Sequence, residues 1–242
     1  QVTITVRNVA PVLSGTNAIP SILEDSQPAG ILVSDLTLGR ITDPSNSTGI
    51  AVTGTTGAGG GTWQWTRDGG TTWNSFSGAS GTSAVLLQTG SQLRVRFLPD
   101  ANWNSTLTAT PPSITFRAWD RSTGTAGGSA DTTVNGGTSA FSTQTATATI
   151  TVNAVSDGPV RTDVANNAPL APLQLLDGSP LTSLGLTTVS FGPGGSTDEA
   201  GQTVSGTVTI TSLPSTLGTV WLSNGTTQVT VGGTYTLTQL RG

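Results

Sequence analysis

Carboxylates and hydroxyls are the side chains of this sequence that could do chemistry. The 242 residues include no His, Cys, Met or Lys, so all nine basic residues are Arg. Without His and Cys, the chain lacks an imidazole base, a thiol nucleophile, a Ser-His-Asp triad and the usual zinc ligands. The adjacent pairs Glu24-Asp25 and Asp198-Glu199 would point to opposite faces of an extended chain, which does not suit a glycosidase pair. We therefore predict that the protein is not an enzyme.

Acidic residues recur at the ends of expected strands and beside linkers. Calcium takes about six to eight oxygen ligands, and carboxylates from separate loops can converge where two domains meet. The net charge of −4, without any Lys cluster, argues against nucleic acid and anionic membranes as partners and suits divalent cations better. The acidic residues concerned are Glu24, Asp25, Asp43, Asp100, Asp120, Asp157, Asp198 and Glu199.

A repeated strand predicts the domain organisation. Residues 2–6 read Val-Thr-Ile-Thr-Val and residues 148–152 read Ala-Thr-Ile-Thr-Val, and a Pro-Val pair follows each, at Pro11 and Pro159. The alternation of apolar and Thr side chains is typical of a strand with one buried face, and proline ends strand pairing. The expected parts are a closing strand of an upstream repeat or a donor strand (1–10), a β-sandwich (11–158), and a second β-sandwich without its last strands (159–242).

The composition favours an all-β chain without a membrane span. Charged residues make up 9% of the chain, and 32 Gly with abundant Ser and Thr disfavour long helices. No stretch is apolar for long enough to cross a bilayer. Two Gly-rich stretches, 54–61 and 122–139, are expected to be surface loops. The seven strands expected in the first sandwich are 31–38, 49–53, 62–66, 84–88, 93–98, 113–119 and 145–155.

The second unit shows more regular alternation in a shorter sequence. Residues 223–226, Ser-Asn-Gly-Thr, predict a hairpin turn because Asn-Gly tolerates positive φ. The expected strands are 186–191, 203–211, 218–222 and 228–231.

One local motif predicts a tight turn. Residues 65–73 resemble the Asp box of bacterial sialidases and other β-propellers, Ser/Thr-x-Asp-x-Gly-x-Thr-Trp. Asp68 is placed to accept hydrogen bonds from turn amides, Gly69 and Gly70 permit a tight backbone, and Trp73 is expected to fold inward. The motif occurs once and is a structural staple, so it predicts no glycosidase activity.

A second resemblance concerns most of residues 11–160 and, more loosely, the second unit. Phe116-Arg-Ala-Trp-Asp120, the closing strand and Ala154-Val-Ser-Asp-Gly-Pro159 resemble the cadherin-like repeats of large bacterial surface adhesins. The resemblance implies tandem immunoglobulin-like antiparallel β-sandwiches in an extracellular stalk at the bacterial cell surface, with calcium near the junctions. The implied calcium ligands are Glu24, Asp25, Asp100, Asp120 and Asp157. Ser156 stands where the family's linker has Asn, and the first linker has no acid.

Three functions follow as hypotheses. The first is a structural or adhesive repeat that forms a rigid stalk together with neighbouring repeats, with calcium as a stiffening ion. The second is a filament subunit in which Val2, Ile4 and Val6 of one copy complete a sheet of the next copy. The third is a module that binds surface glycans by stacking sugars on Trp103, Trp119 or Trp221.

Overall fold

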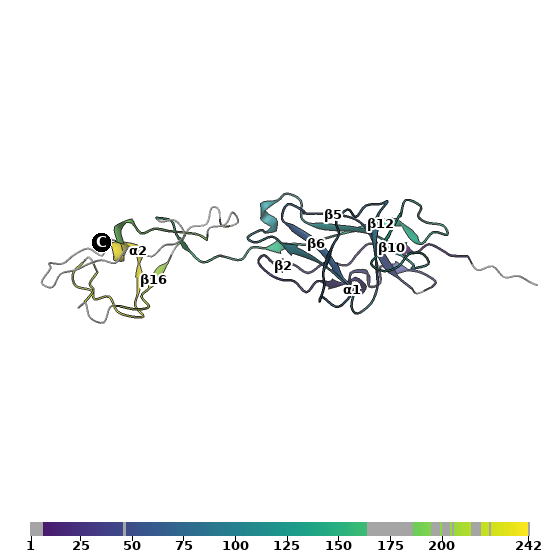
Figure 1. Cartoon of the computed structure of the whole chain (residues 1–242). Helices are drawn as coiled ribbons and strands as arrows, with labels where there is room; N and C mark the ends of the chain where they lie inside the picture. The colour runs from purple at the N-terminus through teal and green to yellow at the C-terminus, as the bar shows by residue number, and fades with distance from the viewer. Residues whose placement is uncertain are drawn as a thin grey trace, which may run out of the picture. The chain divides into compact units, whose positions relative to one another are not determined.

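The computed structural model describes residues 7–45, 47–163, 186–194, 199, 204, 206–213, 219–222 and 224–241. The chain divides into two compact units, unit 1 (Gln1–Val155) and unit 2 (Ser156–Gly242). The described residues form several antiparallel sheets and almost no helix, as the composition predicts (Figure 1).

The larger sheet of unit 1 has five antiparallel strands in the order β11-β8-β5-β10-β12. The middle of β10 alternates with period two: Ile114, Phe116 and Ala118 are fully buried, while Thr115 and Arg117 between them are partly exposed. The strands are β5 (Gly49–Thr56), β8 (Ala84–Gln88), β10 (Ser113–Trp119), β11 (Ser129–Ala130) and β12 (Phe141–Thr149).

The smaller sheet has four strands in the order β3-β9-β6-β7. Trp63 and Trp65 on β6 are buried, and so are Val95 and Phe97 on β9. The paired strands β6 and β9 therefore present one apolar face. The strands are β3 (Ile31–Leu32), β6 (Gly61–Thr66), β7 (Asn74–Ser75) and β9 (Arg94–Pro99).

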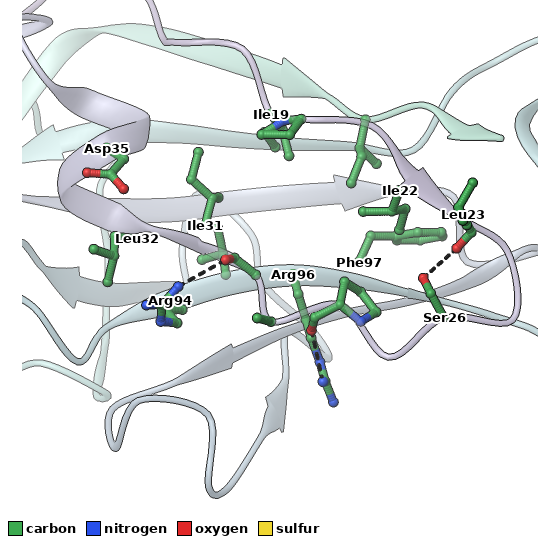
Figure 2. A pocket seen from close by; sticks show the side chains of 16 residues that line it. Ile19, Ile22, Leu23, Ser26, Ile31, Leu32, Asp35, Arg94, Arg96 and Phe97 are labelled. Carbon is green, nitrogen blue, oxygen red and sulfur yellow. Dashed lines mark hydrogen bonds between the residues drawn. The ribbon is translucent and has the colours of Figure 1, made fainter.

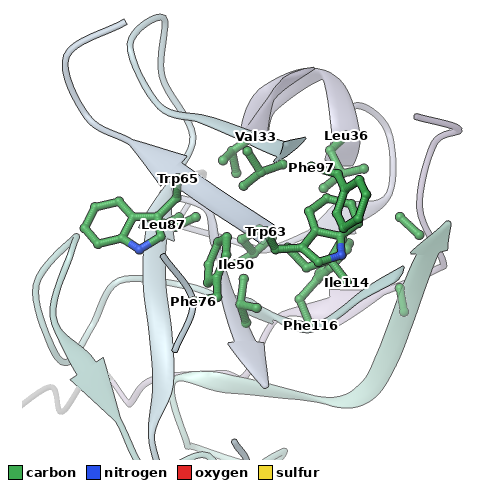
Figure 3. Packing of buried hydrophobic residues seen from close by; sticks show 14 of the residues in the cluster. Val33, Leu36, Ile50, Trp63, Trp65, Phe76, Leu87, Phe97, Ile114 and Phe116 are labelled. Carbon is green, nitrogen blue, oxygen red and sulfur yellow. The ribbon is translucent and has the colours of Figure 1, made fainter. Parts of the chain in front are cut away.

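Both sheets contribute side chains to one hydrophobic cluster, shown in Figure 3. Ile50 and Phe116 of the larger sheet pack in the same cluster as Trp63 and Phe97 of the smaller one. The rings of Trp63 and Phe97 lie 5.5 Å apart at 59°, a tilted arrangement that aromatic pairs favour. Burial of these large side chains is the main source of stability for unit 1.

A second, smaller cluster lies outside this core and includes Ala51, Leu86 and Phe141 around Trp119. Trp119 is 1% exposed, and its Nε1 donates to the carbonyl of Thr123 at 2.8 Å. Residues 122–139 are therefore not only a surface loop. They contain β11 and the buried Thr132, and they help to cover this cluster.

Short strand pairs complete unit 1. β1 (Val12–Leu13) pairs with β4 (Ile41–Thr42), and β2 (Ile22–Leu23) pairs in parallel with β13 (Val152–Asn153). The single strand expected at 145–155 is thus divided. β12 pairs antiparallel with β10, and β13 pairs with β2 after a break at residues 150–151.

One expected strand is partly helical. Residues 31–38 form the short strand β3 followed by helix α1 (Val33–Thr37). Val33, Leu36 and Thr37 are buried at the i, i+3 and i+4 spacing of one helix face. The side-chain amide of Asn17 donates to the carbonyls of Asp35 and Leu38, which satisfies acceptors at the end of the helix. Tertiary packing therefore overrides the β-branched, apolar composition that predicts a strand.

The turn between β5 and β6 is shorter than expected. β5 continues to Thr56 and β6 begins at Gly61, so only residues 57–60 of the stretch 54–61 form the connection. The indole Nε1 of Trp63 donates to the carbonyl of Thr56 at 3.0 Å and ties the two strands together.

The described part of unit 2 has short pairs around a small core. β14 (Val160–Arg161) pairs with β15 (Phe191–Gly192), and β16 (Thr207–Thr209) pairs with β17 (Thr234–Thr236). Leu222, Val229 and Tyr235 are its buried apolar residues in one cluster. The remaining elements are the 3-10 helix η3 (Leu186–Thr188) and α2 (Leu237–Arg241).

The predictions for unit 2 are met only in part. A turn forms at 224–227, one residue after the predicted 223–226: Asn224 Oδ1 accepts from the backbone N–H of Thr226 and of Thr227, and Gly225 has φ of 66°. Within the described residues 219–222 and 224–231, the flanking segments make one bridge, Trp221 with Gln228, in place of the expected strands 218–222 and 228–231. Within 186–191, only Phe191 is in a strand.

We predict opposite effects on stability when two glycines of β5 are replaced by alanine. A Cβ added to Gly49 would lie 2.6 Å from the carbonyl oxygen of Leu87 and 2.9 Å from the ring of Trp119, whereas a Cβ at Gly54 would meet nothing within 4 Å. We expect Gly49→Ala to destabilise unit 1 by about 1–3 kcal/mol through overpacking. Gly54→Ala is expected to stabilise it by up to about 1 kcal/mol because glycine weakens strands. Calorimetric melting of both variants checks this, and equal melting temperatures would contradict it.

Candidate functional site

A buried carboxylate holds the chain where it leaves unit 1. Glu24 follows β2 and is 2% exposed. Its Oε1 accepts from the backbone N–H of Val155 at 2.5 Å, and its Oε2 accepts from the side-chain amide of Asn104 at 3.3 Å. The Glu24 N–H donates to the carbonyl of Asn153 at 3.0 Å. We refer to Glu24, Asn104 and Val155 as the C-terminal clamp.

A second buried carboxylate holds the chain where it enters unit 1. Asp120, directly after β10, is 4% exposed. Its Oδ2 accepts from the side-chain amide of Asn8 at 2.6 Å, and its Oδ1 accepts from the N–H of Ser122 at 2.8 Å. The amide of Asn8 also reaches the carbonyl of Ser139 at 3.1 Å. We refer to Asn8, Asp120 and Ser139 as the N-terminal clamp.

The two clamps lie at opposite ends of unit 1. Figure 1 shows the first described residues leaving the unit at the end opposite to β2, the strand that precedes Glu24. Glu24 and Asp120, which the cadherin-like resemblance implies as calcium ligands, therefore do not share one site within the unit.

The other predicted calcium ligands lie elsewhere. Asp25 adopts φ of 57°, and its Oδ1 accepts from the N–H of Asn102 at 2.9 Å. Asp100 is exposed on the same loop. Asp157 belongs to unit 2, where its N–H donates to Oε1 of the buried Glu199 at 3.0 Å.

Across the described part of the chain, no group of three or more Asp, Glu, His or Cys residues could hold a metal ion. The donor set that the resemblance implies is therefore dispersed in these residues, and calcium binding stays a prediction. Asp198 and the strand-exchange residues Val2, Ile4 and Val6 lie outside the described residues.

Residue type alone does not indicate that the side-chain amides of Asn8 and Asn104 bind the two buried carboxylates. Asn104 is fully buried and also caps the 3-10 helix η1 (Ser105–Leu107) by accepting from the N–H of Thr106. Its Asn-Ser-Thr triplet fits the glycosylation sequon, yet a buried, hydrogen-bonded amide is not accessible to glycan transfer. The nearest sequence signal for its role is Asn before a helical turn.

The Asp-box-like turn forms as predicted. Asp68 Oδ1 accepts from the N–H of Thr71 at 3.0 Å and from that of Thr72 at 2.9 Å, and Gly69 and Gly70 have φ of 75° and 109°. Hydrogen bonds from the hydroxyls of Thr66 and Thr72, and then from backbone N–H groups, hold the pKa of Asp68 well below its usual range. Trp73 was expected to fold inward, and it is only partly buried. The Arg96 guanidinium stacks on its ring at 3.8 Å.

This turn gives a pH-dependent prediction. Because the folded-state pKa of Asp68 is depressed, its contribution to stability is complete above the ordinary pKa of 3.8 and is lost as pH falls through the folded-state pKa. We expect Asp68→Asn to melt at a lower temperature than the parent at pH 7, and this difference to shrink below about pH 4. Melting curves from pH 2 to 7 check this, with Asp35→Asn as an exposed control. A difference that does not vary with pH would contradict the prediction.

The three tryptophans considered for glycan stacking differ in access. Trp119 is buried, so its face is not available to a sugar. Trp103 is partly buried, with its ring 5.9 Å from that of Phe97. Trp221 in unit 2 is 45% exposed and is the most accessible of the three.

Comparison with known proteins adds no relative. No protein-family model, curated protein or solved structure matches the chain. Among the described residues, no helix has the length and apolar character needed to cross a membrane.

Proposed function

We propose that the chain is a tandem immunoglobulin-like, cadherin-like β-sandwich module that serves as an extracellular spacer or adhesive stalk of a large bacterial surface protein. Two features of unit 1 support this proposal. Its five-stranded and four-stranded sheets share one core, which is the packing expected of a sandwich. Its closing segment carries the repeated Thr-Ile-Thr-Val motif, which suits a chain built from serial units.

The pair of clamps is the observation that carries the proposal. Asn8 and Val155 are bound by buried carboxylates at opposite ends of unit 1. Ala148, Ile150 and Val152 of the closing segment are at most 3% exposed, so the chain passes directly from the core to the C-terminal clamp. A pull on both ends would therefore act on hydrogen-bonded, buried attachments before it reached the sheets. Such a unit can transmit tension along a stalk.

The proposed spacer role does not depend on calcium. Both oxygens of Glu24 and both oxygens of Asp120 accept hydrogen bonds from protein groups. These hydrogen bonds hold the two carboxylates in place without an ion. The prediction that calcium binds is tested separately by thermal melting across a calcium titration. A melting temperature that neither calcium nor chelator changes would reject calcium binding.

Strand donation between copies is the second candidate. The apolar residues of the repeated motif at 148–152, which are Ala148, Ile150 and Val152, are buried in the core, and residues 2–6 have a nearly identical sequence. Residues 2–6 are thus suited to dock on a sheet of another copy, which would make an extracellular filament. Glycan binding is a third candidate that Trp221 alone favours.

Light scattering of the purified chain distinguishes the stalk from the filament. We would measure mass for the chain and for a variant without residues 1–9, each with calcium and with chelator. The stalk predicts monomers in every condition. Long polymers that disappear when residues 1–9 are deleted would favour the filament hypothesis over the stalk. The glycan hypothesis needs a separate measurement: quenching of tryptophan fluorescence by added sugar would favour it.

A further inference from the structure

The five-stranded sheet of unit 1 ends on one side in a long edge strand. β12 is last in the order β11-β8-β5-β10-β12, and within the described residues it pairs with β10 alone. The other outer strands of the two main sheets, β3, β7 and β11, have two residues each. A very short edge strand resists pairing with other chains, whereas a long one can template it. β12 is therefore the edge most open to an added strand.

The backbone groups on the outer side of β12 come from alternate residues. The N–H of Ile150 donates to the carbonyl of Pro112 at 3.0 Å, which sets the phase of the ladder with β10. In this antiparallel register the even-numbered residues of β12 face β10, and the odd-numbered residues turn their N–H and carbonyl groups outward. The odd-numbered residues concerned are Thr145, Thr147 and Thr149. Within the described residues, no other backbone group bonds to these outward groups.

The same outer side is covered by β2 further along the chain, at residues 151–153. There the N–H of Ile22 donates to the carbonyl of Thr151 at 3.0 Å. Because donors in this parallel ladder recur at every second residue, the next one would be residue 20, opposite Thr149. Residue 20 is proline, which has no N–H, so the ladder ends before it reaches β12.

The segment around Pro20 is bound to its own unit. Ile19 and Ile22 line an apolar cavity of about 480 Å³ that Phe97 also lines (Figure 2). This packing holds β2 in its register. The outward groups of residues 145–149 are therefore left for a strand of another chain.

The free part of the edge matches itself in an antiparallel pair. Residues 145–149 read Thr-Ala-Thr-Ala-Thr, which is the same in both directions. About a twofold axis at Thr147, Thr would lie opposite Thr on the exposed face, and Ala opposite Ala on the buried face. Unit 1 already contains a cross-strand Thr pair of this kind, because the Oγ1 atoms of Thr115 and Thr147 lie 2.9 Å apart.

Charge does not oppose such a pair. Residues 141–149 include no charged side chain. In the register of β10 with β12, Arg117 lies beside Thr145 and Ser113 lies beside Thr149. Antiparallel pairing would therefore align Arg117 of one copy with Ser113 of the other, and the two arginines would stay apart.

We propose that residues 145–149 of β12 pair with the same residues of a second copy of the chain, so that two five-stranded sheets join edge to edge. This twofold contact closes at the dimer and does not propagate into a fibre. It needs neither calcium nor residues 1–9. The inference goes beyond the spacer role, because it lets neighbouring stalks associate side by side.

The pairing is weak for a single pair of chains. A ladder of this length in contact with water corresponds to a dissociation constant of about 1 mM. Chains in dilute solution therefore stay monomeric, as the stalk predicts. Stalks crowded on one surface pair because their effective concentration is much higher.

Sedimentation equilibrium of the full chain, from about 20 μM to about 2 mM, tests the proposal. We expect the average mass to rise from that of the monomer toward that of the dimer and no further. A monomer mass over the whole range would overturn the proposal. Growth beyond the dimer would also overturn it, in favour of strand donation by residues 2–6.

Amide hydrogen exchange locates the contact. Between the dilute and the concentrated sample, exchange at Thr145, Thr147 and Thr149 should slow about twofold or more, because their outward N–H groups become bonded. Exchange at Ala146 and Ala148, which face β10, should not change with concentration. Slowing at another surface, without any change at the three threonines, would overturn the proposal.

Substitutions at the twofold axis test the register. Thr147→Pro removes the outward N–H and leaves the bonds to β10, since proline is tolerated where the N–H of an edge strand faces solvent. We expect it to weaken dimerisation at least about tenfold. Thr147→Val, which keeps the N–H, should stay within about twofold of the parent.

A charge at the same position is a second test, because proline could also disturb β12. Thr147→Lys would place two lysines opposite each other on the axis and should weaken dimerisation at least about tenfold. Thr143→Lys is its matched control, since Thr143 is exposed on the same strand outside the paired residues. Parental dimerisation in both Thr147→Pro and Thr147→Lys would overturn the proposal.

Discussion

Replacing Phe116 with alanine is expected to lower the free energy of unfolding of unit 1 by about 3–5 kcal/mol. Phe116 is fully buried on β10, which pairs with both β5 and β12, and it belongs to the cluster that both sheets share. Truncation would therefore leave a cavity against both sheets at once. Urea unfolding monitored by tryptophan fluorescence measures the effect, because Trp63 and Trp65 lie in the same cluster.

Leu38→Ala is the control for this experiment. Leu38 is 75% exposed, so its truncation should change the free energy of unfolding by less than about 0.5 kcal/mol. Two separate transitions for the two sheets of unit 1, or a loss below about 1 kcal/mol in Phe116→Ala, would show that the sheets do not share one cooperative core.

Replacing Glu24 with alanine is expected to destabilise unit 1 by about 2–4 kcal/mol. The change leaves the Val155 N–H and the Asn104 amide without their acceptor, and a buried unsatisfied donor costs about 1–3 kcal/mol. Glu24→Gln should be intermediate because one carbonyl oxygen remains as an acceptor. Amide hydrogen exchange at Val155 should also become at least tenfold faster, which reports release of the linker directly.

Asp100→Ala is the matched control for Glu24→Ala. Asp100 is an exposed acid near the same end of unit 1, on the loop that Asp25 contacts through Asn102. Its truncation should leave both stability and exchange at Val155 close to parental values. If the two variants behave alike, Glu24 is not a clamp and the spacer proposal loses its main support.

Much of the sheet architecture of unit 1 was predictable because local alternation and burial agree. β8, β9 and β10 lie within a residue of their expected ranges, and each has a period-two burial pattern or a short apolar run. The helix α1 was not predictable, because its apolar residues fit a strand equally well until the packing of Val33 and Leu36 is known.

The sequence indicated which acidic residues matter at the two clamps, but it did not indicate which groups they bind. Glu24 and Asp120 stand out as carboxylates beside strands, yet their partners Val155 and Asn8 are separated from them by 131 and 112 residues. Periodicity and spacing carry no information about contacts over such distances. The Asp68 turn was predictable because all of its hydrogen bonds to Asp68 are local, within four residues.

Mechanical unfolding of the chain, held at its two ends between reference domains, tests directly whether unit 1 can transmit tension. We predict one force peak for unit 1, with a length gain of about 3.6 Å per released residue. We also predict a lower peak force in Glu24→Ala and Asp120→Ala, because each releases one attachment of the unit, and an unchanged force in Asp100→Ala. Extension of unit 1 without a force peak, or equal peak forces in all variants, would contradict a role in transmitting tension.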